Sequence, residues 1–264
     1  MALQAMADAR ARSTATATST VLHVYHPLGF PAPGQDETYL GAAIRAGAQV
    51  LELGIPFSDP VADGPVLQDA SRQALDAGMT PAAAIAAVAR LRARHPHVGL
   101  VLMAYANSLH SLGWEQAARA LGAAGAQGLI VPDMPLREAL RVQPVLAASR
   151  VPWIPLVSST VPEATVRAAA ALAPPFVYAA SLGVTGQAGP GDEAIAALRR
   201  IRAVAPGVPV AVGFGVRDGD DVRRLRAAGA DGVVVGSALV KRVLDGATPD
   251  DYGAVVAGLR RACG

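Results

Sequence analysis

The stretch LELGIPFSDPVADGP, residues 51–65, places a glutamate inside an apolar, β-prone run and follows that run with an Asp-Gly-Pro sequence. A carboxylate in an otherwise apolar strand costs free energy unless it is paired or has a chemical use. What Glu52 does therefore depends on the fold that surrounds this strand.

Similar runs recur along the chain and alternate with stretches of helical spacing, such as residues 82–95 and 114–126. Strands that alternate with helices of this length predict βαβ units and a parallel sheet. Eight such units without a linker-like interruption predict a single (β/α)8 TIM barrel, and an open doubly wound sheet is the alternative. The predicted strand segments are 21–29, 50–56, 99–106, 128–135, 151–159, 175–183, 209–215 and 231–239.

Three of the predicted helices end in Ala-Gly-Ala, with Gly47, Gly125 and Gly229 at the centre. Glycine there suits the left-handed residue that closes a helix before the next strand. We expect the barrel to form one catalytic domain over residues 21–264. Residues 1–20 are rich in Ala, Ser, Thr and Arg, a composition shared with transit peptides, but a flexible leader is the simpler interpretation.

The composition fits a globular α/β protein of 264 residues, with 52% hydrophobic and 17% charged side chains. The 23 basic and 21 acidic residues nearly balance, and no basic block predicts a nucleic-acid partner. Cys263 is the only cysteine, which excludes an intramolecular disulfide framework and fits a reducing compartment. No run has the length and apolarity of a membrane span, so we expect a cytoplasmic protein.

The alternation of side chains along a strand predicts the orientation of Glu52. It points to the face opposite Leu51 and Leu53, and an apolar pair suits the helix-covered side. Glu52 should then face the barrel interior, near the end of the barrel where active sites lie. A carboxyl group walled by apolar neighbours holds its proton more readily than one in water, which suits proton transfer near neutral pH. The alternative is a structural ion pair, but no predicted strand interior carries a Lys or Arg.

Other polar side chains lie where predicted strands end. Asp63 precedes Gly-Pro, so it could cap the helix that starts near Pro65 or act as a second acid, and the sequence leaves both open. Tyr25, Tyr105 and Tyr178 lie near strand ends and could pack on an apolar substrate ring or fill the core.

Glycines with a nearby hydroxyl follow two of the last three predicted strands, and Gly213-Phe214-Gly215 follows the other. Bare backbone N–H groups, a hydroxyl and a helix N-terminus together form the usual phosphate site. Barrels often place this site after the seventh and eighth strands. These clusters predict a phosphorylated ligand, bound by Gly186, Gly213, Gly215, Gly236 and Ser237.

Taken together, these motifs resemble one known family. LELGIPFSDPVADGP closely resembles the signature segment of the tryptophan synthase alpha subunit. The resemblance extends over about residues 21–245, and the segment 51–65 at the second strand is its most specific part. The other matching motifs are PLGFP at 27–31, IVPDMP at 130–135, GVTG at 183–186, GFG at 213–215 and VGSALV at 235–240.

The resemblance implies a lyase that cleaves indole-3-glycerol phosphate to indole and glyceraldehyde 3-phosphate, by a retro-aldol reaction in tryptophan biosynthesis. It implies that Glu52 shuttles protons to carbon 3 of the indole and from the glycerol hydroxyl. Asp63 would bind the indole N–H and stabilise the positive charge on the ring. It implies no metal and no organic cofactor in this chain. Substrate contacts would come from Tyr25, Tyr105, Tyr178, Thr185 and Phe214.

The resemblance also implies a partner, a beta subunit that uses pyridoxal phosphate, in an alpha2beta2 heterotetramer. The loops after the second, third and sixth strands would form the docking surface. Three features depart from the family pattern: the leader has no apolar stripe, Leu182 alone separates Ser181 from GVTG, and Ser108 stands where many members have proline.

These departures keep alternative functions open. One is a stand-alone indole-releasing lyase of a specialised pathway, which would be active without a beta subunit. Another is a non-catalytic barrel that binds a phosphorylated ligand and regulates a partner, although such a module would not need Glu52. A third is another phosphate-binding barrel enzyme, such as a sugar-phosphate isomerase or epimerase.

Overall fold

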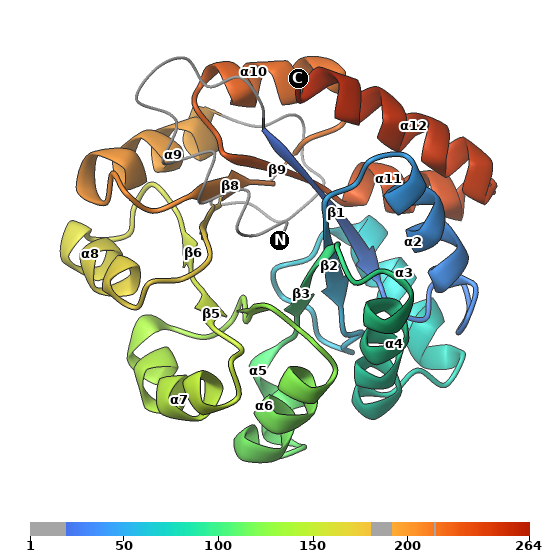
Figure 1. Ribbon diagram of the computed structural model, residues 1–264, viewed down its shortest axis with the longest axis horizontal. Coiled ribbons are helices and arrows are strands. Elements are labelled where there is room, and N and C mark those ends of the chain that lie inside the picture. Colours follow the sequence, from blue (N-terminus) through green and yellow to red (C-terminus); the bar gives the residue numbers. More distant parts are fainter. Residues whose placement is uncertain (1–19, 181–191, 214) are drawn as a thin grey trace.

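The computed structural model describes residues 20–180, 192–213 and 215–264. Apart from Thr20, the predicted leader lies outside these residues, and so do the predicted site residues Thr185, Gly186 and Phe214. The described strands form the centre of the molecule and the helices form a ring around them (Figure 1).

The strands of the described residues are all parallel and pair in the order β5-β4-β3-β2-β1-β9-β8-β7-β6. Each predicted strand segment contains one strand, except the segment 151–159, which contains two. The strands are β1 (Val21–Pro27), β2 (Val50–Gly54), β3 (Gly99–Met103), β4 (Leu129–Ile130), β5 (Trp153–Ile154), β6 (Leu156–Val157), β7 (Val177–Ala179), β8 (Val210–Val212) and β9 (Gly232–Val235).

The fifth predicted segment closes the barrel. Pro155 divides it into β5, which pairs with β4, and β6, which pairs with β7. The two ends of the pairing order therefore meet within one segment of chain. The predicted (β/α)8 TIM barrel is confirmed, and the alternative of an open doubly wound sheet is wrong.

The helices cover the outside of this barrel (Figure 1). The last helix, Pro249–Ala262, packs against the helices Asp36–Arg45 and Gly219–Ala227. The helices are α2 (Asp36–Arg45), α3 (Pro65–Asp76), α4 (Pro81–Arg94), α5 (Ala106–His110), α6 (Trp114–Ala123), α7 (Leu136–Ala148), α8 (Glu163–Ala171), α9 (Asp192–Val204), α10 (Gly219–Ala227), α11 (Ser237–Leu244) and α12 (Pro249–Ala262).

The glycines of the three Ala-Gly-Ala sequences have the predicted left-handed conformation. Their φ angles are 103° at Gly47, 83° at Gly125 and 93° at Gly229. Each glycine closes a helix and lets the chain turn directly into the next strand.

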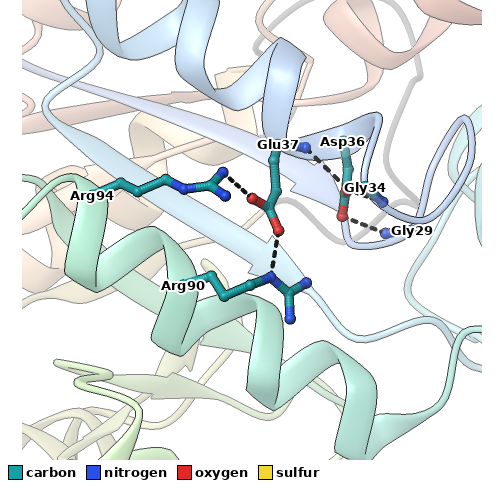
Figure 2. Close-up of polar contacts among 6 residues, drawn as sticks. All are labelled: Gly29, Gly34, Asp36, Glu37, Arg90 and Arg94. Atoms are coloured by element: carbon teal, nitrogen blue, oxygen red, sulfur yellow. Dashed lines mark hydrogen bonds and ion pairs between the residues drawn. The ribbon is translucent and has the colours of Figure 1, made fainter.

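Two acidic residues at the start of α2 hold the loop that follows β1 (Figure 2). The Asp36 carboxylate accepts hydrogen bonds from the backbone N–H groups of Gly29 (2.7 Å) and Gly34 (2.9 Å). Glu37 forms ion pairs with Arg90 and Arg94 of α4. The loop at this strand end is therefore tied both to its own helix and to a neighbouring one.

Among the described residues, no single helix combines the length and apolarity of a membrane span. Only α3 and α4 taken together reach that length and composition, and they are bent by 99°.

Candidate active site

A cavity lies at the carboxyl ends of the strands, where (β/α)8 barrels place their active sites. Most of its wall is apolar, and two carboxyl groups and two phenols interrupt it. Its lining residues are Tyr25, Glu52, Asp63, Leu67, Met103, Ile130, Leu156, Tyr178, Gly213, Val234, Gly236 and Ser237. Seven of the residues singled out from the sequence thus meet in one cavity, although they come from distant parts of the chain.

Glu52 lies in the wall of this cavity and its side chain is only 1% exposed. Its Oε1 is 2.8 Å from Nδ1 of His23, which is fully buried on β1. The expectation of purely apolar neighbours was therefore wrong, because it considered only Lys and Arg as partners. The missed signal was strand position: His23 shares the interior face of β1 with Tyr25, the residue that pairs in register with Glu52.

Asp63 is buried, and the alternative role of helix cap is wrong. The N-cap of α3 is Gly64, and no side chain caps that helix. Burial raises the pKa of Asp63 to about 6, partly offset by a hydrogen bond from the Tyr105 hydroxyl, which lowers it. Its Oδ1 has no hydrogen-bond partner among the described residues. A buried carboxylate oxygen without a donor costs free energy, which a ligand donor in the cavity would offset.

The three tyrosines separate into two groups. Tyr25 and Tyr178 line the cavity, and burial raises the pKa of both phenols well above the usual value, so both stay protonated. Tyr105 is not among the lining residues. Its hydroxyl accepts a hydrogen bond from the Ala62 N–H (3.1 Å) and donates to Asp63. Tyr105 therefore orients the acid in the cavity wall.

Glycines make room for the two lining tyrosines. A Cβ at Gly54 would overlap the Tyr25 hydroxyl, and a Cβ at Gly213 would overlap the Tyr178 hydroxyl. A Cβ at Gly236 would come within 3.0 Å of the Tyr25 ring. The sequence reading gave Gly213 and Gly236 only a phosphate-binding role, and the structure adds a steric one.

A helix N-terminus opens onto the same cavity. Gly236 is the N-cap of α11 and Ser237 is its first residue, and both line the cavity. No side chain of the described residues caps this helix, so its first backbone N–H groups can bind an anion. Gly215, in the turn after β8, has a φ of 82° and is not among the lining residues. Within the described residues, no group of His, Cys, Asp and Glu side chains could hold a metal ion.

The cavity thus combines an apolar slot, two acids of different surroundings and an anion-binding helix end. A family model for the tryptophan synthase alpha chain matches residues 12–257. The chain belongs to the tryptophan synthase alpha chain family. It is 40% identical to the alpha chain of Laribacter hongkongensis, over 89% of both chains. It is also 40% identical to the alpha chain of Halorhodospira halophila, over 96% of this chain and 94% of that one.

Solved structures agree with this membership. The alpha chain from Legionella pneumophila str. Paris superposes with a TM-score of 0.87 and 28% identity over 98% of both chains. A ligand-free tryptophan synthase from M. tuberculosis superposes with a TM-score of 0.85 and 29% identity, over 99% of this chain and 97% of that one.

Membership in the tryptophan synthase alpha chain family establishes the reaction. These chains are the lyase subunits that cleave indole-3-glycerol phosphate in tryptophan biosynthesis, and they need no cofactor because pyridoxal phosphate belongs to the beta chain. The resemblance drawn from the sequence motifs is confirmed. The sugar-phosphate isomerase or epimerase and the non-catalytic barrel are not supported.

Proposed function

We propose that the cavity binds indole-3-glycerol phosphate and that Glu52 and Asp63 divide the chemistry of its cleavage. The observation that carries this assignment is the pair of buried acids in one apolar cavity. Glu52 has a hydrogen-bond partner, whereas one oxygen of Asp63 has none among the described residues. Two carboxyl groups in different surroundings can hold different protonation states at the same pH.

Asp63 binds the indole N–H. This donor offsets the cost of the unpartnered Oδ1, and it aligns the ring with the apolar wall formed by residues such as Leu67 and Ile130. When carbon 3 of the indole gains a proton, positive charge develops on the ring, and an ionised Asp63 stabilises it. Because burial raises the pKa of Asp63 to about 6, the carboxylate is available above that pH.

Glu52 moves the protons. Its protonated form donates to carbon 3 of the indole, and the resulting carboxylate removes the proton from the hydroxyl on the adjacent glycerol carbon. The carbon–carbon bond then breaks, its electron pair returns to the ring, and the alkoxide carbon becomes the aldehyde. Indole and glyceraldehyde 3-phosphate leave, and Glu52 ends with the proton it needs for the next cycle.

The phosphate binds at the start of α11. Gly236 and Ser237 supply backbone N–H groups and a hydroxyl at the positive end of the helix dipole. Gly213 and Gly215 lie in the turn after β8, and Gly186 and Thr185 of the GVTG motif complete the predicted set. Tyr25 and Tyr178 bound the ring, and Phe214 is assigned to the same role.

We also propose that a tryptophan synthase beta subunit docks on the loops after β2 and β3. Val61 in the first loop is 72% exposed, an unusual position for an apolar side chain. The second loop is held where α5 begins by a hydrogen bond of 2.9 Å from the Ala106 N–H to Asp133 in the loop after β4. A biosynthetic enzyme whose single cysteine is buried fits the cytoplasm.

Indole release from indole-3-glycerol phosphate tests this proposal, with the purified chain alone and with a beta subunit. We expect weak release alone, strong stimulation by the partner, and a loss in Glu52→Gln of at least about 10²-fold, typical of removing a general acid–base group. The control is Glu37→Gln, because Glu37 has a side chain only 9% exposed but lies outside the cavity. Strong release without the partner would instead identify a stand-alone lyase, and an active Glu52→Gln would contradict the assignment of Glu52.

A further inference from the structure

The barrel interior holds a titratable group that the proposed mechanism does not use. His23 on β1 is fully buried, and its Nδ1 lies 2.8 Å from Oε1 of Glu52. Its ring also packs edge-on against Phe176, with ring centroids 5.2 Å apart and an interplanar angle of 82°. A histidine at this depth is surrounded by the barrel core, so its contact with the carboxyl group is shielded from solvent.

The strand register places His23 deeper in the barrel than Glu52. In the β1–β2 pairing, Tyr25 is opposite Glu52 and His23 is opposite Val50. His23 is therefore two residues further from the carboxyl ends of the strands than the position opposite Glu52. His23 is not among the described residues that line the cavity, whereas Glu52 is. The contact with Glu52 therefore gives His23 a route by which it can act on a substrate in the cavity.

We propose that His23 is a positioning residue that holds the Glu52 carboxyl group in place for proton transfer. In this arrangement Nδ1–H of His23 donates to Oε1, which can accept whether or not Oε2 carries the proton. This holds one oxygen and leaves Oε2 to exchange protons with the substrate. The inference rests on the proposed role of Glu52.

Other titratable groups also face Glu52, and the test has to separate them from His23. They are Tyr25 on the same strand as His23, Tyr178 on β7 and Asp63 in the loop after β2. Both phenols are kept protonated by burial, and Asp63 carries negative charge above pH 6. The feature that sets His23 apart for the test is its hydrogen bond to the Glu52 carboxyl group, in which Nδ1 lies 2.8 Å from Oε1.

Two variants of His23 distinguish its hydrogen bond from its bulk. His23→Val removes the donor, whereas His23→Asn places an amide N–H near the position of Nδ1. We expect His23→Val to lower kcat by on the order of tenfold to a hundredfold, since misplacing a catalytic group by about 1 Å can cost about 10²-fold. KM for indole-3-glycerol phosphate should change little, the pH profile of kcat should shift, and His23→Asn should recover kcat to within about threefold of the original chain.

The matched control is His26→Asn. His26 is also fully buried on β1 but lies on the opposite face, where its Nε2 contacts the Phe30 carbonyl oxygen at 2.8 Å. It should leave kcat and the pH profile unchanged whatever it does to stability. An unaltered kcat and pH profile in His23→Val would overturn the proposal, and so would equal losses in both His23 variants, because bulk and not the hydrogen bond would then matter.

A spectroscopic measurement keeps the test independent of activity. In the ¹H–¹⁵N NMR spectrum of the histidine side chains, the Nδ1–H proton of His23 should resonate downfield because it donates to a carboxylate. Glu52→Gln should move this resonance upfield and His26→Asn should leave it in place. A resonance that does not respond to Glu52→Gln would overturn the positioning role, whereas an active Glu52→Gln enzyme would instead refute the assigned role of Glu52.

Discussion

Asp63 is only 2% exposed to solvent, and its Oδ1 has no hydrogen-bond partner among the described residues. Burial favours its neutral form and raises its pKa from 3.8 to about 6. A shift of this size corresponds to roughly 3 kcal/mol, at about 1.4 kcal/mol for each pKa unit. The charge that we propose for catalysis therefore lowers the stability of the folded chain.

The sign of the pH dependence follows from proton binding. Between pH 3.8 and about 6 the folded chain binds more protons at Asp63 than the unfolded chain does. Stability from this residue is therefore fully present below pH 3.8 and is lost as the pH rises through 6. We predict that Asp63→Asn raises Tm at pH 8 more than at pH 4, while indole release is lost at both.

Thermal unfolding at the two pH values checks this prediction. Asp59→Asn is the control, because Asp59 lies in the same loop but is exposed. It should change Tm by a similar small amount at both values. An Asp63→Asn chain with no larger gain at pH 8 would show that burial does not disfavour the charge.

At the scale of single elements, the glycines that follow helices show two separate requirements for glycine, a left-handed backbone conformation and a lack of space for a side chain. Gly229, between α10 and β9, has a φ of 93°, although a Cβ there would meet no atom within 4 Å. Gly207, between α9 and β8, has the same open space, but its φ lies outside the left-handed region. The two glycines therefore differ in conformation and share the absence of steric conflict.

We predict that Gly229→Ala lowers the free energy of unfolding by about 1 kcal/mol, because an L-residue is strained at positive φ. Gly207→Ala should be neutral or stabilise by up to about 1 kcal/mol, since alanine restricts the unfolded chain. Urea unfolding of both variants measures the difference. Equal effects in the two would mean that the conformation at Gly229 is not the reason for glycine there.

The fifth strand segment shows where element prediction from sequence loses detail. Residues 151–159 form one apolar run, so the pattern predicted one strand. Pro155 has no N–H to donate, and the run is divided there into β5 and β6. Which neighbour each half pairs with depends on closure of the whole barrel, and that is not encoded in a local pattern.

At the scale of the whole molecule, the barrel interior is built by side chains from neighbouring strands that share limited space. The three atoms closest to a Cβ at Gly54 on β2 all belong to Tyr25 on β1. The ring that lines the cavity therefore depends on a glycine in another strand.

We predict that Gly54→Ala destabilises the protein by about 1–3 kcal/mol through overpacking. Combined with Tyr25→Phe, which removes the nearest atom, the cost should fall by about 1 kcal/mol. A double-mutant cycle of unfolding free energies measures this coupling. Additive effects of the two substitutions would show that Gly54 is not there to accommodate the Tyr25 ring.

The sequence by itself determined the (β/α)8 barrel, the family and the interior orientation of Glu52. These follow from the alternation of strands and helices, the two-residue period of a strand and the motif at 51–65. Each of these signals is local, because hydrophobic burial imposes the period of an element on its own residues.

Only the tertiary structure decided that His23 is the partner of Glu52, that Tyr105 orients Asp63 and that glycines accommodate the two lining tyrosines. His23 and Glu52 are 29 residues apart, and Tyr25 of β1 meets Gly236, which follows the last strand, β9. Such contacts depend on the register between strands and on closure of the barrel. The physical reason is that the pattern within a strand predicts the face on which a side chain lies. The residues that this side chain contacts on other strands are determined only when the strands pack together.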